Sequence, residues 1–368
     1  MTLELTRLDV AQLSPAAQRV LGVGVPSQAK MMAARGLVPM GPVDLVTVLY
    51  QLSRDPEQKI AEAANKTADN LPENVLIGAL SGALDPRVLD YFSGKVAGKA
   101  ALIEVVLLNK ATHDETFYTL GRIISGRGLE ILAGNQSRLM RYPAIIEAIY
   151  FNRKAPMSMV DRLLQWAVRN SLKVEGIPQF QQIAKGILGN ETESIAAETK
   201  VSDSSKVDEI FASVLAEDLK EETQSETEKL VEPENAEKGV RIRDLPLSAK
   251  IRLATLGNMF HRMVLIKDSA RTVALAAISS PAVSEQEAMR YASQRELPED
   301  VVRYIANKKE WHKNYGMKLN LVNNPKCPLR VSMNLLQYLR PMDVKILARS
   351  KNIPAPLVKA AKARSKQE

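Results

Sequence analysis

The stretch Asn324–Tyr338, NPKCPLRVSMNLLQY, repeats in altered form the stretch Asn152–Trp166, NRKAPMSMVDRLLQW, which lies 172 residues earlier. Six of the fifteen positions are identical in register, and the last position pairs two large aromatic residues. In both copies a proline precedes apolar residues at helical spacing. Such a helix cannot bury its apolar face alone, but stacking on neighbouring units into a superhelix would bury it. The doubled stretch therefore predicts a repeat of short α-helices.

The same offset aligns residues well outside the doubled stretch. Thr112 to Glu115 aligns with Ser284 to Glu287, and both have the Ser/Thr-x-x-Glu pattern of a capping box that begins a helix. Asn135 aligns with Asn307, and no gap is needed between these points. Chance gives roughly one identity in fifteen positions at ordinary residue frequencies. We infer an internal duplication that relates the two halves of the chain.

Two residue types that are present in both copies of the doubled stretch have structural roles in the predicted repeat. Asn152 and Asn324 each follow an apolar run, and we expect them to end a helix in the left-handed conformation that Asn tolerates. Pro156 and Pro328 have the fixed φ that suits the first turn of the next helix. The predicted unit is therefore helix, tight turn, helix.

Length and composition agree with an array of helices. A chain of 368 residues exceeds the size at which one core stops growing, about 250 to 300 residues. Hydrophobic residues make up 45%, charged residues 25% and aromatic residues only 5%, and both halves read as short apolar runs broken by Pro and Gly. We expect two helical domains, because this composition favours helices over sheets and almost no stretch alternates over the length of a strand.

The charge of the chain changes sign twice along its length. Residues 1–190 have 21 Lys/Arg and 17 Asp/Glu, residues 191–239 have 5 and 15, and residues 240–368 have 24 and 10. The middle part is rich in Glu, Ser and Thr, a composition that buries too little apolar area to fold. These data predict an N-terminal helical repeat domain at 1–190, an acidic, largely disordered linker at 191–239 and a basic C-terminal helical repeat domain at 240–368. Within the linker, the apolar spacing of 207–219 predicts one docking helix.

The opening Asn-Pro-Lys-x-Pro-Leu, with VSMNLLQYL and LRPMDVKILARSKNIP after it, resembles the short helical units of leucine-rich-repeat-variant and HEAT-like proteins. Residues 247–364 are also similar to a group of bacterial helical proteins. The first half of the chain shares this similarity more weakly. The leucine-rich-repeat-variant family has a Cys-rich cluster at its N-terminus, which the single Cys327 cannot supply. The resemblance therefore implies architecture only: an all-α fold of two related α-solenoid (HEAT-like) arrays joined by the acidic linker.

Residue patterns for catalysis or metal binding are scarce. His113, His261 and His312 are isolated from one another in sequence and match no ligand spacing. The close glycines of 22–27 and 124–134 match no phosphate-binding pattern, and we interpret them as helix breaks. We expect a protein that is not an enzyme, with no catalytic, cofactor-binding or metal-binding residues and no cofactor.

The basic second half carries the predicted binding surface. Between residues 308 and 318, cations alternate with aromatic residues, as on surfaces that bind nucleic acids or acidic peptides. A competing interpretation is an ordinary solvated helix face in which Trp311 and Tyr315 form a core pair. The candidate binding surface comprises Lys308, Lys309, Trp311, His312, Lys313, Lys326, Arg330, Arg349 and Lys351.

Two functions fit these patterns. The first is a non-enzymatic cytoplasmic scaffold or adaptor that presents helical-repeat surfaces to a protein partner. The alternative is a nucleic-acid-binding protein that uses the basic C-terminal half, for which the acidic linker would compete within the chain. We expect a cytoplasmic protein because there is one cysteine, the N-terminus MTLELTRLDV has no signal-peptide pattern, and no apolar run is long enough to span a membrane.

Overall fold

The computed structural model describes residues 5–178, 180–181, 183–184, 207–209, 211–212, 242 and 245–365. Within these ranges every regular element is a helix and no residue is in a β-strand, so the predicted all-α class is confirmed. The chain divides into two compact units, Met1–Ala155 with Arg162–Gly176 and Pro156–Asp161 with Ile177–Glu368. Most of the expected linker at 191–239 lies outside the described residues, so its boundaries stay predictions.

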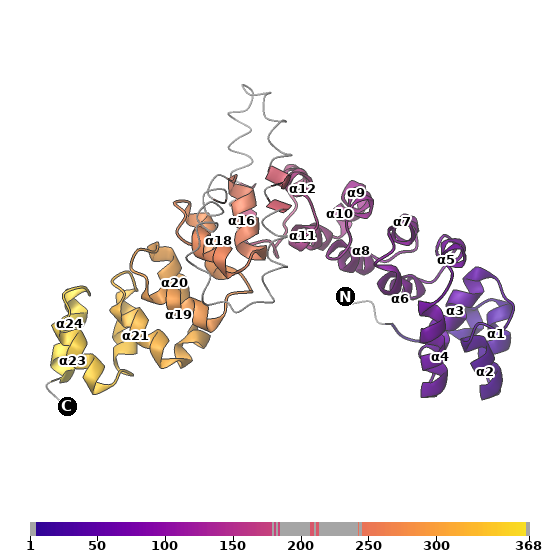
Figure 1. Cartoon of the computed structure of the whole chain (residues 1–368), viewed down its shortest axis with the longest axis horizontal. Helices are drawn as coiled ribbons and strands as arrows, with labels where there is room; N and C mark the ends of the chain where they lie inside the picture. Colours follow the sequence, from indigo (N-terminus) through magenta and orange to yellow (C-terminus); the bar gives the residue numbers. More distant parts are fainter. Residues whose placement is uncertain are drawn as a thin grey trace, which may run out of the picture. The chain divides into compact units, whose positions relative to one another are not determined.

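The first unit is built of short helices that pack in two layers. Helices of odd number contact one another in succession from α1 to α9, and α2, α4, α6, α8 and α11 form a second such series, as Figure 1 shows for α5, α7 and α9. The helices are η1 (Val10–Gln12), α1 (Pro15–Leu21), α2 (Ser27–Ala34), α3 (Pro42–Leu52), α4 (Gln58–Asp69), α5 (Glu73–Leu80), α6 (Pro86–Val96), α7 (Ala100–Leu108), α8 (Asp114–Gly121), α9 (Arg127–Gly134), α10 (Gln136–Arg141), α11 (Ala144–Phe151) and α12 (Met157–Arg169).

Packing between layers stabilises these helices, since none is long enough to be stable alone. In α4, Ile60, Ala64 and Ala68 recur every four residues and are all buried, so one face of the helix supplies the core contacts. Local capping sets the helix ends. Asp85 caps α6 by accepting a hydrogen bond from the Arg87 backbone N–H at 2.9 Å, and Pro86 occupies the first helical position.

The second unit has the same two-layer packing. Helices α16, α18 and α20 contact in succession, α19 contacts α21, and α24 contacts both α22 and α23. The helices are α16 (Leu247–Leu256), α17 (Met259–Leu265), α18 (Arg271–Ser279), α19 (Glu285–Ser293), α20 (Glu299–Asn307), η4 (Lys309–Lys313), α21 (Tyr315–Asn323), α22 (Leu329–Leu336), α23 (Pro341–Arg349) and α24 (Ala355–Ser365). Pro156 and the first residues of α12, 157–161, belong to this unit, and the rest of α12 belongs to the first.

Eight consecutive elements of the two units correspond in order. Each element from α5 to α12 has a counterpart from α16 to α22, and every starting residue is displaced by 172 positions to within two residues. The 3-10 helix η4 takes the place of α10 in this series. The offset found in the sequence is thus an offset between structural elements, as the inferred duplication requires.

Some details of the predicted helix starts and breaks are wrong. The glycine-rich stretch at 124–134 contains helix α9, which begins after Gly126 at a φ of 60°. Gly128 lies buried inside α9, where an added Cβ would come within 3.2 Å of the Ile124 side chain. That glycine therefore permits close packing and does not break the helix. The other glycine pair, within 22–27, does separate α1 from α2 as expected.

Candidate functional site

A buried asparagine joins successive helices of one layer in both copies of the repeat. The Asn152 side chain donates through Nδ2 to the carbonyls of Gly121 and Ile124, both at 2.8 Å. The Asn324 side chain donates in the same way to Ala292 at 2.9 Å and Gln294 at 3.1 Å. Each asparagine follows the last residue of its helix, and its acceptors lie at the end of the preceding helix of that layer. We call this arrangement the amide latch.

The amide latch has relatives elsewhere in both units. Asn109 donates to the carbonyls of Leu80 and Gly82, at 2.7 and 2.9 Å. Ser280 also donates to a carbonyl at the end of an earlier helix, that of Thr255. Arg364 donates in a similar way to the carbonyls of Leu336 and Leu339. Carbonyls at helix ends have no partner within their own helix, so these side chains satisfy acceptors that would otherwise be buried unpaired.

The latch corrects the expected role of the two asparagines. Asn152 has φ −76° and ψ 113°, and Asn324 has φ −87° and ψ 118°, so both are extended and not left-handed. Their side chains, and not their backbone conformation, explain the repeated Asn. The prolines also lie slightly earlier than expected: α12 and α22 begin directly after Pro156 and Pro328.

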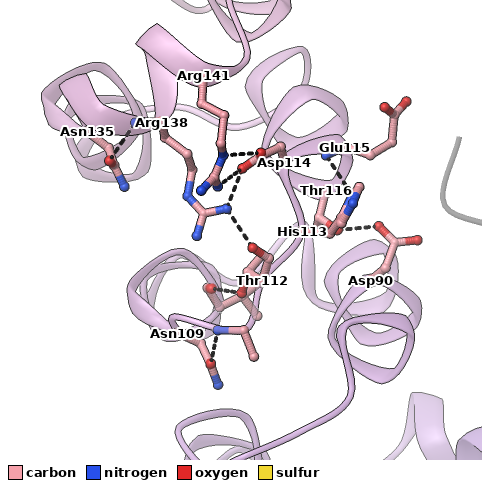
Figure 2. Close-up of polar contacts among 12 residues, drawn as sticks. Asp90, Asn109, Thr112, His113, Asp114, Glu115, Thr116, Asn135, Arg138 and Arg141 are labelled. Atoms are coloured by element: carbon pink, nitrogen blue, oxygen red, sulfur yellow. Dashed lines mark hydrogen bonds and ion pairs between the residues drawn. The ribbon is translucent and has the colours of Figure 1, made fainter. Parts of the chain in front are cut away.

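A polar junction surrounds the start of α8 in the first unit (Figure 2). Asp114 accepts hydrogen bonds from Arg138 at 2.7 Å and from Arg141 at 2.7 and 2.6 Å. Burial alone would raise the pKa of Asp114, yet the two arginines lower it overall. The residue at the helix start is His113, whose Nδ1 accepts from the Glu115 backbone at 3.2 Å, so the expected Thr112 capping box is wrong. All these groups bind one another, which identifies a structural junction.

The second unit has a more deeply buried junction between α17 and α19, the counterparts of α6 and α8, and not at the counterparts of the first junction's α8 and α10. Arg262 forms a two-point ion pair with Glu287, with distances of 2.9 and 2.8 Å, and the Tyr291 hydroxyl donates to the same carboxylate at 2.7 Å. The side chains of Arg262 and Glu287 are only 5% and 3% exposed. Burial and the bond to Glu287 both raise the pKa of Tyr291. Ser284 caps α19 as expected, but Glu287 binds Arg262 and is not seen to complete a capping box.

Residues of the predicted docking helix contact α12 and α16. Asp208 accepts from the backbone N–H and the hydroxyl of Ser158, at 2.9 and 2.6 Å. Phe211 is buried, and the Arg252 guanidinium lies 4.8 Å from the centre of its ring. Burial raises the pKa of the neighbouring Asp161 to about 6, opposed by a hydrogen bond with Ser248 and by the charge of Arg252. The described residues of 207–219, namely 207–209 and 211–212, thus contact α12 and α16, and the docking helix as a whole stays a prediction.

The predicted basic and aromatic cluster in η4 is only partly exposed. Trp311 is buried and packs edge-on against Tyr304, not against Tyr315, and the Lys308 ammonium lies 4.2 Å from the Trp311 ring centre. His312 is half-buried, and this burial lowers its pKa. Trp311 is therefore a core residue, and it does not present its ring for stacking. The two flanking lysines of η4, Lys309 and Lys313, are exposed.

The remaining predicted residues lie around α22 and α23. The Lys326 ammonium donates to the carbonyls of Glu296 and Leu297, at 3.2 and 2.6 Å, close in sequence to the carbonyls that Asn324 binds. Arg330 on α22, Arg349 at the end of α23 and Lys351 after it are exposed. Among the described residues none of the three forms an ion pair. They are cations that a partner could reach.

Sequence reasoning missed an exposed apolar component next to these cations. On α23, Met342 and Ile346 are 73% and 65% exposed, and together with Lys345 and Arg349 they form one stripe at helical spacing. We call this stripe the α23 face. On α22, Leu329 and Met333 are 40% and 37% exposed. A helical projection of 341–349 would have shown the α23 face, because the buried residues Val344, Leu347 and Ala348 occupy the opposite side.

The three histidines and the cysteine are possible metal ligands, and all four lie within the described residues. Within that part of the chain no three His, Cys, Asp or Glu side chains lie close enough to hold a metal ion. His261 is buried and caps α17 together with Asn258, and the Cys327 thiol is buried with a raised pKa. No helix in the described ranges has the length and hydropathy needed to cross a membrane.

The structure thus defines an all-α protein of short paired helices, with a duplicated core and an exposed basic and apolar surface at its C-terminal end. Comparison of the chain with protein-family models, curated proteins and solved structures gives no match. The expected resemblance to HEAT-like and leucine-rich-repeat-variant proteins stays a prediction.

Proposed function

We propose that the protein is a non-enzymatic binding scaffold whose C-terminal array binds a protein partner. The observation that carries this proposal is the α23 face, where two largely exposed apolar side chains alternate with Lys345 and Arg349. Exposed apolar residues that are clustered, and not scattered, mark interaction sites. The cations beside them favour a partner segment with acidic residues around an apolar stripe.

The charge around the α23 face supports an acidic partner. Between residues 308 and 364 the chain has 13 Lys/Arg and two Asp/Glu. Asp343, one of the two acids, accepts a hydrogen bond from the Tyr315 hydroxyl. An excess of this size attracts acidic ligands over a distance of about one Debye length, roughly 8 Å at physiological salt.

The proposal is tested by charge reversal on the α23 face. The double variant Lys345→Glu/Arg349→Glu changes two exposed residues, and Lys59→Glu/Lys66→Glu on α4 is a control with equal change of net charge. Proteins retained by each from a nuclease-treated lysate are identified by mass spectrometry and then titrated in purified form. We expect one partner to bind the wild type and the α4 control with equal affinity and the α23 variant at least tenfold more weakly. Equal binding by all three would overturn the proposal.

A nucleic-acid-binding function is the second candidate, favoured by the exposed cations Lys309, Lys313 and Lys351. Phosphate contacts give an affinity that falls steeply with salt, whereas apolar anchors do not. A single-stranded oligonucleotide is therefore titrated at salt concentrations from about 50 to about 200 mM, a range over which phosphate contacts lose much of their affinity. This titration distinguishes the two functions. A linear fall of log affinity with log salt, together with loss of all captured proteins after nuclease treatment, would favour this candidate.

A further inference from the structure

The two copies of one helix, α12 and α22, differ in what covers their N-terminal face. Met157, at the start of α12, is fully buried, and the next residue, Ser158, binds Asp208. At the matching positions of α22, displaced by 172 residues, stand Leu329 and Arg330, and both are exposed. The helices are otherwise seated alike, because the pair Leu163–Leu164 and the pair Leu335–Leu336 are buried in both copies.

The segment that covers α12 combines a carboxylate with an aromatic ring. Asp208 accepts two hydrogen bonds at the first turn of α12, where a negative charge is favoured by the free backbone N–H groups. Phe211, three residues later, is buried against Arg252, which is itself fully buried. Residues 207–209 and 211–212 are helical, and the acid and the ring stand three residues apart in the sequence.

The uncovered face of α22 offers complementary chemistry for a segment of this kind. We define the α22 face as Leu329, Arg330 and Met333, which correspond to Met157, Ser158 and Asp161 of the covered copy. Arg330 brings a cation to the first turn, where the covered copy has a neutral hydroxyl. Leu329 and Met333 lie one turn apart, and a methionine sulfur makes favourable contacts with aromatic rings. No acidic residue occurs in α22 to oppose a carboxylate.

We propose that the α22 face binds a helical segment of a partner protein that has an acidic residue and, three residues later, an aromatic residue. The acid binds Arg330 and the first turn of α22, as Asp208 binds Ser158 on the other copy, and the ring packs on Leu329 and Met333. This inference rests on the proposed scaffold function and specifies the chemistry of its partner, and it uses a helix other than α23. The partner segment supplies at the first turn of α22 the carboxylate that Asp208 supplies at the first turn of α12.

The first experiment uses a labelled peptide with the sequence of residues 207–219, VDEIFASVLAEDL, titrated against the full chain by fluorescence anisotropy. We expect saturable binding that weakens at least tenfold in Leu329→Asp/Met333→Asp and several-fold in Arg330→Glu. The control Met140→Asp alters a residue of α10 that is 48% exposed and should bind as the wild type does. Peptides with Asn in place of the acid at 208, or Ala in place of the phenylalanine at 211, should bind at least tenfold more weakly.

The peptide could also bind at α12 by displacing the same sequence of the chain itself. Binding at α12 would not change in the α22 variants, so these variants distinguish the two binding sites. Binding that is unchanged in Leu329→Asp/Met333→Asp, or absent from the wild type, overturns the inference. So does a concentration-dependent dimer that the same variant abolishes, since the occupant would then be a second copy of this chain. Preferential loss of oligonucleotide binding in that variant likewise overturns it. If the peptide fails while the α23 variant still loses its partner, the scaffold function stands and the α22 inference alone is wrong.

Discussion

The two copies of the repeat have the same amide latch but different charged junctions. Asn152 and Asn324 make equivalent hydrogen bonds to backbone carbonyls. The ion pair of the first copy centres on Asp114 and is reached by solvent, since the Arg141 side chain is 65% exposed. That of the second copy centres on Glu287, which is 3% exposed. The backbone-directed contact is the shared feature, and the charged contacts differ between the copies.

The difference has a physical reason. The acceptors of the latch are carbonyls, which every residue provides, so the contact survives changes in neighbouring side chains. An ion pair requires two particular side chains, and the 172-residue offset places Gln286 opposite Asp114 and Glu310 opposite Arg138. The pair of the first copy therefore has no equivalent in the second. Comparison of the two copies by mutation measures how much each type of contact stabilises the fold.

The largest effect is expected from Glu287→Ala. The substitution leaves the Arg262 guanidinium buried without its carboxylate, and loss of one partner of a buried pair costs about 3 to 5 kcal/mol. Urea denaturation with hydrogen exchange of α17 and α19 measures the loss. The double variant Arg262→Met/Glu287→Leu is the control, and it should be much closer to the wild type because neither charge is left alone. Equal loss in the single and double variants would show that packing, not charge, dominates.

The substitutions Asn152→Ala and Asn324→Ala test whether the latch is equivalent in the two copies. Each removes a donor of two hydrogen bonds and leaves two carbonyls without that partner, which costs roughly 2 to 3 kcal/mol. We expect similar losses in the two variants, measured by chemical denaturation. Serine, which fills this role at Ser280, should restore part of the loss. Losses that differ by more than about 1 kcal/mol, well above ordinary non-additivity, would break the equivalence.

The covered and uncovered helices α12 and α22 differ in a titratable group, since Asp161 corresponds to Met333. The folded pKa of Asp161 is about 6, above its ordinary value of 3.8, so the folded state holds this proton more tightly than the unfolded state does. Stability therefore falls as pH rises from about 4 to about 6 and then levels off, by roughly 2 to 3 kcal/mol. Denaturation midpoints of Asp161→Asn across this range should lack this component. Identical pH profiles for the variant and the wild type would contradict the assignment.

The smallest effect is expected from Arg141→Ala in the first junction. The Arg141 side chain is mostly in solvent, and exposed ion pairs contribute little to stability. Its denaturation midpoint should match that of the wild type within error. Arg138→Ala is the informative companion, because Arg138 is 11% exposed and lies 3.9 Å from the centre of the Phe117 ring. A lower midpoint for Arg138→Ala alone would confirm that burial determines the effect.

Much of the fold could be predicted from the sequence because apolar spacing and proline position are local signals. The helices predicted to begin at Pro156 and Pro328 are found as α12 and α22, each starting one residue after its proline. The helix at 127–134 was missed because Gly128 was interpreted as a break. Its role depends on the nearby side chain of Ile124, and packing of this kind is not visible in a single sequence.

The candidate site was less predictable. The cations Arg330 and Arg349 were identified correctly as exposed residues, because arginine and lysine keep their charges in water in almost any fold. Trp311 was not, since an aromatic residue between lysines has the same pattern whether it faces the core or the solvent. Its burial depends on Tyr304 in the preceding helix. The exposed apolar residues of α22 and α23 were missed for the same reason. Whether an apolar side chain is exposed depends on which other helices pack against its own helix, and the sequence of that helix does not show this.

The amide latch has an evolutionary consequence. Because each latch recognises only main-chain carbonyls, a segment copied elsewhere in a gene would fit its new neighbour at once, without co-adaptation of the side chains on either side. Recombination could then lengthen or shorten the array by whole helix pairs while the outward-facing residues diversified independently. Asn109, between α5 and α7, and Asn152, between α8 and α11, already make this kind of contact in both layers of the first unit.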